Sequence, residues 1–389
     1  MEFSKVYPLQ SRASDASVKQ PKELIGYSRD INGVYHIDDS QLSYYYFPDS
    51  QMNVPGGVDL QAGFKEFQAN GEDFGEFSGL LAALEVVERK NSAKTPVDII
   101  TWRGLMRSLM TLPFFNREKL VFNIVPFDGQ LFIQQDFQNA REAAELEKLS
   151  RSDLNKRQMF SGYKFEQVST LSKPWAQCTR KEIEQRGKVP VNNIEQYATV
   201  VKTSFGKTNL VMGAEVDCVF DYKPEDSDPL PHYVELKTTR ILDSPKSVFS
   251  FENKLLKFWA QCFLVGIPKI ICGFRDDNLI LRTVEEYRTD KIPVMVKNNP
   301  LPNKSPSKNK FMQSLKFFNG LINWINETVP RDETRTYRLV FDPTVNPNYL
   351  NLSENSPDLT ASLLDPESGV IPRKFRDWRS ELAATSTNV

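Results

Sequence analysis

Two short segments of the chain place charged residues at alternate positions, in a pattern suited to metal-assisted chemistry on a phosphate. In the first segment, Glu215 and Asp217 lie two positions apart. In the second segment, Glu235 and Lys237 lie two positions apart. Because side chains two residues apart on a β-strand share a face, each pair should lie on one side of its strand. Carboxylates gathered in this way repel one another unless a cation lies between them, so the pattern predicts a divalent metal site.

The residues between the two segments predict that 213–219 and 233–239 pair as a β-hairpin. The connecting stretch, Lys223–Pro231, is rich in proline and acidic residues, which is typical of turns. The alternative is a solvent-exposed strand face with salt bridges. Strongly apolar residues flank both segments, however, and carboxylates within apolar strands are costly unless they are paired or bind a metal. We therefore favour the metal site.

The composition limits the chemistry and the partners of the chain. Its 389 residues, 40% of them hydrophobic, can form a large core, and a net charge of −1 means that any nucleic acid must bind a local basic patch. The sequence contains no apolar run of about 18 residues, so we expect no membrane span. With only two histidines, zinc sites and histidine relays are nearly excluded. Hydrolysis would depend on carboxylates, lysine and Mg²⁺ or Mn²⁺.

The order of helical and strand patterns predicts an α/β fold of the mixed α+β type, in which mixed β-sheets are flanked by helices. We expect one domain over residues 1–389, with an ordered core over about 20–380 and mobile ends at 1–19 and 381–389. We also expect a polar surface arm over 1–60 with an edge strand at 44–47, and a mobile segment at 352–370. The predicted helices are 74–92, 103–110, much of 136–170, 251–265 and a final helix at 313–329. The predicted strands include 98–102, 121–125 and 130–134 as a hairpin, two strands within 193–220, 269–274 and a last strand at 337–341.

Three further features point to a phosphate site, although each is weak alone. Gln261 interrupts an apolar stretch of helix 251–265, where it faces either the site or a backbone partner at the edge of the core. Glu166 is a single acid among apolar neighbours. Arg103 and Arg107 follow a predicted strand, and such a strand-to-helix junction can direct guanidinium and backbone N–H groups to a phosphate.

Together, in order and in spacing, five segments resemble the DXO family of RNA 5′-end decapping enzymes, within the Asp/Glu-x-Lys nuclease superfamily. These segments are 101–104, 162–166, 213–218, 233–238 and 256–264. The likeness extends over about residues 20–380. Features at 20–23, 266–275 and 283–286 are similar to the fungal nuclear branch, which is known as the partner and activator of the nuclear 5′→3′ exoribonuclease.

The resemblance implies roles for individual residues. The metal ligands would be Glu166, Glu215, Asp217, Glu235 and the main-chain carbonyl of Leu236. Glu215 could instead orient water and substrate. The catalytic set would be Glu215, Asp217, Glu235, Lys237 and Gln261, of which the last two contact the scissile phosphate. The residues engaging the 5′ nucleotide or the leaving phosphates would include Trp102, Arg103 and Gly104. Ala198 stands where animal-type relatives have a cysteine, at a position whose backbone could line the 5′-end pocket.

The function implied by the resemblance is metal-dependent hydrolysis at RNA 5′ ends in the nucleus, with one or two Mg²⁺ or Mn²⁺ ions. The substrates would be 5′-triphosphate RNA, which loses pyrophosphate, and RNA carrying an unmethylated guanosine cap or an NAD-type cap. The product would be 5′-monophosphate RNA. The motifs do not rank these substrates, because all of them would use the same metals.

Two other classes of function stay open at this point. The chain could act mainly as a non-catalytic stabilising partner of the exoribonuclease, bound through the loop that carries Trp175 or through another surface. Trp175 lies beside a proline in residues 171–177, where an exposed tryptophan would be a good interface anchor and a buried one would belong to the core. A DNA endonuclease of the wider superfamily is the third class.

Overall fold

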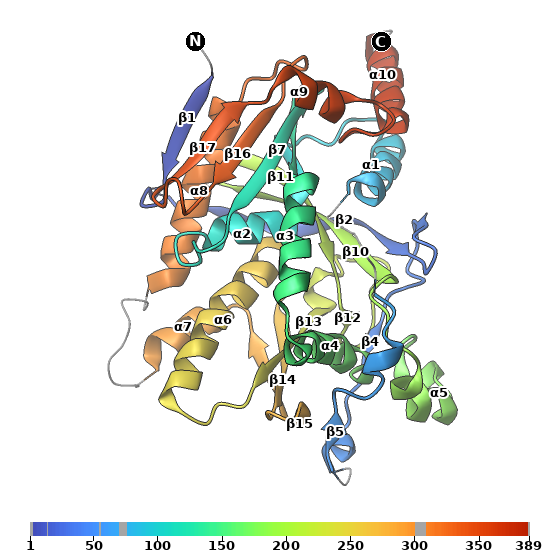
Figure 1. Ribbon diagram of the computed structural model, residues 1–389. Coiled ribbons are helices and arrows are strands. Elements are labelled where there is room, and N and C mark those ends of the chain that lie inside the picture. Colours follow the sequence, from blue (N-terminus) through green and yellow to red (C-terminus); the bar gives the residue numbers. More distant parts are fainter. Residues whose placement is uncertain (1–2, 14, 54–55, 70–75, 300–308, 388–389) are drawn as a thin grey trace.

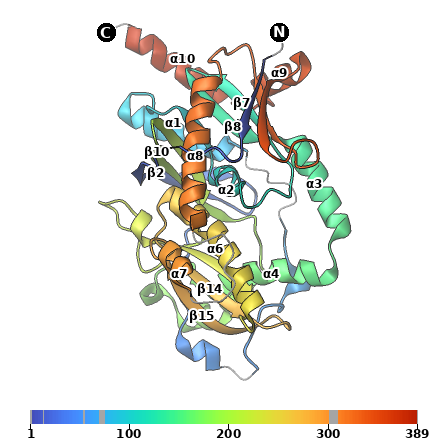
Figure 2. The same cartoon turned by 90° about the vertical axis from the view of Figure 1, so that its left-hand side faces the viewer.

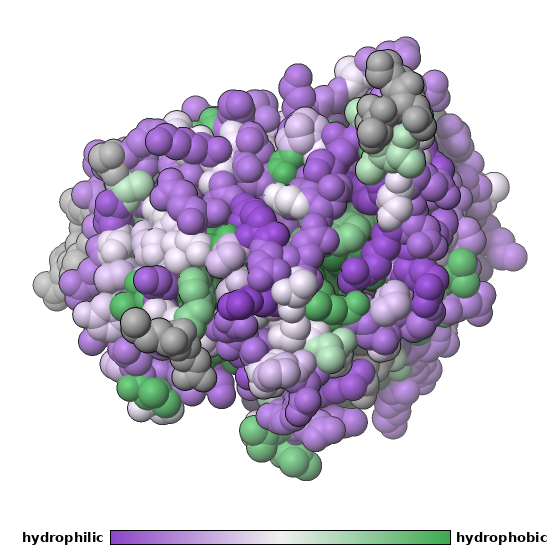
Figure 3. Space-filling model, turned by 90° about the horizontal axis from the view of Figure 1, so that it is seen from above, coloured by the Kyte–Doolittle hydropathy of each residue, from purple (hydrophilic) through white to green (hydrophobic). Residues whose placement is uncertain are grey.

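The computed structural model describes residues 3–13, 15–53, 56–69, 76–299 and 309–387. Two β-sheets stand one above the other in Figure 1, with helices packed around and between them. This arrangement confirms the predicted mixed α/β class. Seen from the end at which both termini lie, most of the surface is hydrophilic and the hydrophobic residues form separate patches (Figure 3).

Among the described residues, the first sheet has ten strands and the second has seven. In spatial order, the first consists of β1 (Ser4–Pro8), β17 (Tyr349–Glu354), β16 (Tyr337–Phe341), β7 (Leu120–Phe127), β8 (Gln130–Gln135), β6 (Ile99–Trp102), β11 (Thr208–Glu215), β10 (Gln196–Phe205), β2 (Val18–Arg29) and β3 (Tyr35–His36). The second consists of β5 (Val58–Asp59), β15 (Ile280–Arg288), β14 (Lys269–Arg275), β13 (Tyr233–Arg240), β12 (Cys218–Val219), β4 (Tyr44–Tyr45) and β9 (Thr170–Leu171).

The helices cover both faces of each sheet. They are α1 (Ser78–Asn91), α2 (Arg103–Thr111), α3 (Phe137–Ser150), α4 (Asp153–Val168), α5 (Arg180–Gln185), α6 (Pro245–Val265), α7 (Ile292–Asn298), α8 (Lys310–Thr328), α9 (Pro357–Leu364) and α10 (Arg373–Thr387). Side chains of β6 alternate between two hydrophobic cores: Ile99 packs with α2, α6 and α8, whereas Ile100 packs with α1 and α10. Helix α6 also lies against β13 and β14 (Figure 2).

The predicted hairpin between 213–219 and 233–239 is only partly right. Strand β11 ends at Glu215 and belongs to the first sheet, where it pairs with β10 and β6. The chain then crosses to the second sheet, and only β12 pairs with β13. Glu215 and Asp217 therefore do not share the face of one regular strand. The backbone N–H of Val216 still bonds to the carbonyl of Tyr197, whereas the Asp217 side chain accepts from the N–H of Leu236 at 2.6 Å.

Several local predictions are confirmed. Strand β6 runs directly into α2, and β7 and β8 form the expected hairpin. Its turn has positive φ angles at Asp128 (49°) and Gly129 (71°), as two-residue hairpin turns require. Helix α6 includes the predicted 251–265, and β14 includes 269–274.

Predictions for the two ends need correction. The expected surface arm contains β1 and β2, both part of the first sheet, and Tyr7 and Leu9 are buried. Strand β4 lies between β12 and β9 and is not an edge strand. Helix α8 and strand β16 are not the last elements, because β17, α9 and α10 follow them and fall partly in the segment expected to be mobile. A few widely spaced apolar residues, such as Ile371 and Phe375, hold this region to the core.

Some predictions fall on segments outside the described residues. Outside them lie residues 1–2, 14, 54–55, 70–75, 300–308 and 388–389, which include parts of the predicted arm and the start of the predicted helix 74–92. Mobility of the two ends stays a prediction. Within the described ranges, no helix has the length and apolar character needed to cross a membrane.

A buried ion pair holds the C-terminal helix to the rest of the fold. Arg379 of α10 is 4% exposed and donates to the Glu88 carboxylate of α1 at 2.7 and 2.8 Å. It also donates to Asp128 and Gln130, and Trp378 donates to Glu88. Figure 1 shows α1 and α10 side by side. Because Glu88 is fully buried, its charge depends on these donors.

We expect Arg379→Met to lower the free energy of unfolding by about 3–5 kcal/mol, because it leaves a buried carboxylate without its main partner. Urea unfolding monitored by circular dichroism measures this change. The double variant Glu88→Gln/Arg379→Met should lose less than the sum of the two single variants. Arg373→Met, which removes the exposed ion pair between the first residue of α10 and Glu367, should leave the unfolding midpoint unchanged. Equal effects of Arg379→Met and Arg373→Met would contradict this account.

Candidate active site

The candidate site begins where the central strand β6 becomes helix α2. Arg103 is the first residue of α2, and its side chain is 7% exposed. Its Nη1 donates to Oε2 of Glu235 in β13 at 3.1 Å, so this contact joins the first sheet's helix to the second sheet. Trp102, the residue before α2, makes no side-chain cap to the helix N-terminus. The sequence therefore places a strand-to-helix junction and a buried guanidinium directly beside the acidic strand.

Glu235 is the centre of a buried polar cluster. Its carboxylate is 1% exposed and accepts hydrogen bonds from Arg103, from Nζ of Lys237 and from Nε2 of Gln261 on α6. Burial alone would raise the pKa of Glu235, but the charges of Lys237 and Arg103 outweigh it and lower the pKa. Gln261 thus faces the cluster, and the alternative of a backbone-bonded amide at the edge of the core is wrong.

Two other carboxylates have raised pKa values, in contrast to the lowered pKa of Glu235. Burial, reinforced by the charge of Asp217, raises the pKa of Glu166 on α4 well above its usual range. Burial and then the charge of Glu235 raise the pKa of Asp217 to about 7. Glu215, at the exposed end of β11, adds to the repulsion at both groups. This is the electrostatic situation that a bound cation relieves.

The donor set suits a hard divalent cation. Glu166, Glu215, Asp217 and Glu235 offer only carboxylate oxygens, the ligand type that Mg²⁺ and Mn²⁺ prefer. Leu236 lies between Glu235 and Lys237, with its N–H held by Asp217, which places its carbonyl in the same strand segment. In the described part of the chain, no three His, Cys, Asp or Glu side chains are already arranged as ligands of one ion. The residues thus fit a divalent metal by donor type and charge.

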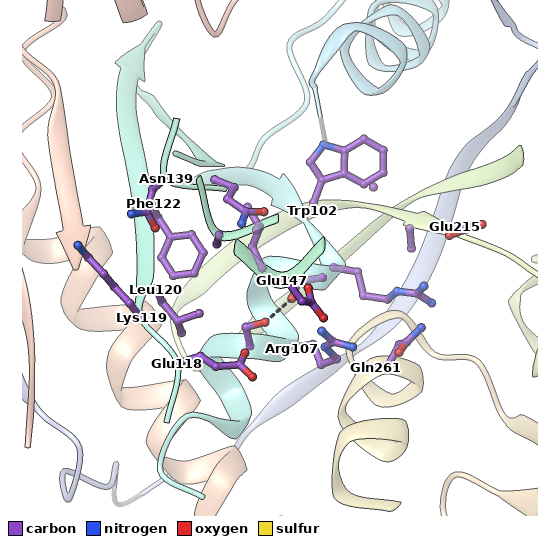
Figure 4. Close-up of a pocket in the computed structure, with 18 of the residues that line it drawn as sticks. Trp102, Arg107, Glu118, Lys119, Leu120, Phe122, Asn139, Glu147, Glu215 and Gln261 are labelled. Carbon is purple, nitrogen blue, oxygen red and sulfur yellow. Dashed lines mark hydrogen bonds between the residues drawn. The ribbon is translucent and has the colours of Figure 1, made fainter. Parts of the chain in front are cut away.

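A large pocket opens beside this cluster, with a volume of about 1140 Å³ (Figure 4). Trp102, Arg103 and Gly104 line it, together with Glu215 and Gln261, so these five predicted residues are brought together. A β-carbon added at Gly104 would touch nothing within 4 Å, which leaves open space beside the start of α2. Ala198 pairs with Glu215 across β10 and β11 and is 7% exposed, but it is not among the residues lining the pocket.

The opposite wall of the pocket was not predicted from the sequence. Helix α3 contributes Asn139, Glu142, Ala143, Leu146 and Glu147, a spacing of three or four that follows one helix face. Leu146 is 69% exposed. The sequence does show leucines beside carboxylates on this helix. That pattern does not show which part of the protein the helix faces. Tyr163 of α4, Asn193 and Arg107 also line the pocket.

Comparison with known proteins identifies the architecture. Residues 19–376 match the model of a family described as RAI1 like PD-(D/E)XK nuclease. The chain belongs to this family. Membership confirms the sequence-based recognition of an Asp/Glu-x-Lys nuclease and makes the chain a hydrolase of that class.

One curated protein and two solved structures illustrate how far the likeness to this nuclease family extends. The Scheffersomyces stipitis protein named decapping nuclease RAI1 is 44% identical over 97% of this chain and 99% of its own. The crystal structure of Candida albicans Rai1 in complex with pU5-Mn²⁺ has a TM-score of 0.91 at 40% identity, covering 98% of this chain and 100% of that one. That of S. stipitis Rai1 in complex with (3'-NADP)⁺ and calcium ion has a TM-score of 0.88 at 42% identity, covering 97% and 100%.

Trp102 and Gly213 form a close contact at the rim of the site. A β-carbon built on Gly213 would lie 2.9 Å from Cε3 and Cζ3 of the Trp102 ring, too close for the ring to keep its place. Gly162 on α4 offers a matched control, because a β-carbon there would come no closer than 4.0 Å to Thr238.

We expect Gly213→Ala to displace the Trp102 ring, to change its fluorescence, and to cost about 1–3 kcal/mol of unfolding free energy. Gly162→Ala should be neutral or stabilise by up to about 1 kcal/mol, because alanine favours a helix interior. Chemical unfolding followed by tryptophan emission measures both effects. If Gly213→Ala were as stable as the wild type with an unchanged spectrum, the contact would not constrain Trp102.

Proposed function

We propose that this protein is a metal-dependent hydrolase acting on RNA 5′ ends. It releases pyrophosphate from 5′-triphosphate RNA and removes unmethylated guanosine caps and NAD-type caps, and it leaves 5′-monophosphate RNA. The observation that carries the proposal is the buried cluster of Glu235 with Arg103, Lys237 and Gln261 at the edge of a pocket large enough for a nucleotide. Two carboxylates with raised pKa values lie beside it.

The relatives support the choice of substrate. The S. stipitis relative is named a decapping nuclease, the C. albicans structure contains pU5 and Mn²⁺, and the S. stipitis structure contains (3'-NADP)⁺ and calcium. A short RNA with a 5′ phosphate and an NAD-type dinucleotide resemble the product and the substrate that we propose. The high coverage of both chains makes a shared pocket the simplest interpretation.

Each residue of the site has a distinct part in this mechanism. Glu166, Asp217, Glu235 and the Leu236 carbonyl would hold one or two Mg²⁺ or Mn²⁺ ions, and Glu215 would bind metal or orient water. When bound, such ions polarise a phosphate and lower the pKa of water. Burial acts to lower the pKa of Lys237, but Glu235 and Asp217 raise it overall, so Lys237 stays charged. Lys237 and Gln261 can then stabilise charge on the scissile phosphate. Arg103 fixes the orientation of Glu235.

We expect the wild type to release pyrophosphate, the guanosine cap or the NAD-type cap from 5′-labelled RNA only when Mg²⁺ or Mn²⁺ is present. Glu215→Ala/Asp217→Ala should lower this rate at least about 1000-fold, because metal-site residues supply most of the acceleration. Thin-layer or liquid chromatography of the released label measures all three substrates and ranks them. Glu145→Gln, an exposed charge change on α3 outside the pocket, is the control.

Other outcomes would favour the remaining classes. If the wild type released nothing from any 5′ end yet stimulated a 5′→3′ exoribonuclease, the chain would be a non-catalytic partner. Internal cleavage of duplex DNA without action on RNA ends would indicate an endonuclease.

We propose further that the protein resides in the nucleus and binds and stimulates a nuclear 5′→3′ exoribonuclease through the segment around Trp175. The Trp175 side chain is 60% exposed and begins a short 3₁₀ turn, Trp175–Gln177, directly after a proline. Exposed tryptophans in such positions are frequent interface anchors. Trp175 is therefore not buried in the core.

We expect Trp175→Ala to weaken the exoribonuclease complex by about 2 kcal/mol or more, while the hydrolysis of free RNA ends is unchanged. Pull-down and calorimetry with the purified exoribonuclease measure the first effect. Leu149→Ala, which truncates a side chain that is 85% exposed on α3, is the matched control. Undiminished affinity of a folded Trp175→Ala protein would exclude this anchor.

A further inference from the structure

Arg107 differs from the other cations that line the pocket. These cations are Arg103, Arg107 and Lys119. Arg103 donates to Glu235, and Nζ of Lys119 lies 3.7 Å from Oδ2 of Asp342. Within the described ranges, the guanidinium of Arg107 makes neither a hydrogen bond nor an ion pair. A partly buried cation without an anionic partner is electrostatically unfavourable, and a planar guanidinium can bind a phosphate through two parallel hydrogen bonds.

Arg107 lines the same pocket as Gln261, one of the two residues that would contact the scissile phosphate. It lies one helical turn after Arg103 on α2, so the two side chains share a helix face. Helices α2 and α6 pack together, and Gln261 of α6 lines the same pocket. Figure 4 shows Arg107 and Gln261 on the same side of the pocket. Burial and the charge of Arg103 lower the pKa of Arg107, which is consistent with a desolvated cation that an anion would stabilise.

The rest of the pocket does not offer a general surface for a polyanion. Four carboxylates line it, those of Glu118, Glu142, Glu147 and Glu215. One of them, Glu147, is paired with Arg151 at 2.6 Å. The carboxylates whose charge acts on Arg107 are those of Glu235 and Glu118. An anion site in this pocket is therefore local to Arg107.

We propose that Arg107 binds the phosphate adjacent to the scissile one, so that the pocket selects a 5′ phosphoanhydride over a single 5′ phosphate. This inference rests on the proposed function, in which Lys237 and Gln261 contact the scissile phosphate. A 5′-triphosphate end, which loses pyrophosphate, carries a second phosphate at this place. The 5′-monophosphate product lacks this second phosphate. The product therefore loses the contact and dissociates more readily than the substrate does.

The test compares two RNAs that cannot be hydrolysed at the 5′ end. They share one sequence and a 3′ fluorophore, and they carry either a 5′ methylenediphosphonate or a 5′ monophosphate. Fluorescence anisotropy with the full chain and Ca²⁺ gives both dissociation constants. We expect the wild type to bind the diphosphonate end about tenfold or more tightly than the monophosphate end, as one charge-assisted contact allows.

Arg107→Met should remove this preference and leave the affinity for the monophosphate RNA within about twofold of the wild-type value. Arg107→Lys should keep part of the preference, because lysine keeps the positive charge but lacks the planar guanidinium. Lys257→Met is the matched control: its Nζ lies 4.3 Å from the centre of the Phe115 ring, near Arg107, but Lys257 does not line the pocket. It should keep the full preference. Thermal unfolding of each variant checks that the proteins are folded.

Two results would overturn the inference: an unchanged preference in Arg107→Met, or an equal loss of affinity for both RNAs, which would make Arg107 a general backbone contact. A different result would refute the proposal that the protein is a hydrolase. If the wild type released nothing from hydrolysable ends, that proposal would be wrong, while the ratio of the two affinities would still decide the role of Arg107.

Discussion

The buried carboxylate of Glu235 is the constraint on which the arrangement of the site depends. A carboxylate that is 1% exposed must be paired, and its three donors come from three different elements, α2, β13 and α6. Each donor can reach Glu235 only if the first sheet, the second sheet and α6 keep their relative positions. The electrostatic requirement of one side chain therefore fixes the geometry of a site assembled from residues 103 to 261.

A second polar cluster supports this arrangement from behind. Glu23 of β2 accepts from Thr199 of β10 at 2.6 Å and from Tyr233 of β13 at 2.8 Å, so it links the first sheet to the second. Tyr233 lies two residues before Glu235, and Tyr197 of β10 lies next to Ala198, which pairs with Glu215. The two sheets are thus joined on both sides of the crossing at 216–217. A site whose carboxylates come from different sheets needs such joints, because small movements between sheets would separate the ligands.

The sequence predicted the chemistry of the site better than its topology. Alternation with a period of two identified Glu215, Asp217, Glu235 and Lys237, because residue type and spacing are local properties. The same alternation could not show that β11 and β12 belong to different sheets, since the choice of strand partner depends on distant residues. The C-terminal elements were missed because polar residues dominate their composition, while a few apolar side chains and the buried Arg379 attach them. The wall formed by α3 was missed because periodicity gives a helix face without saying what it faces.

The charges in the pocket explain how a nearly neutral protein can act on a polyanion. Three cations and four carboxylates line the pocket, and two of the cations are already paired with carboxylates of the protein. A long RNA backbone would gain little there, because attraction at one wall is offset by repulsion at α3. The end of a chain is different, since it would need only local contacts, such as those offered by the metal-binding carboxylates and the start of α2. In the proposed function, selection for an RNA end would therefore follow from the placement of a few charges and would not require a basic surface.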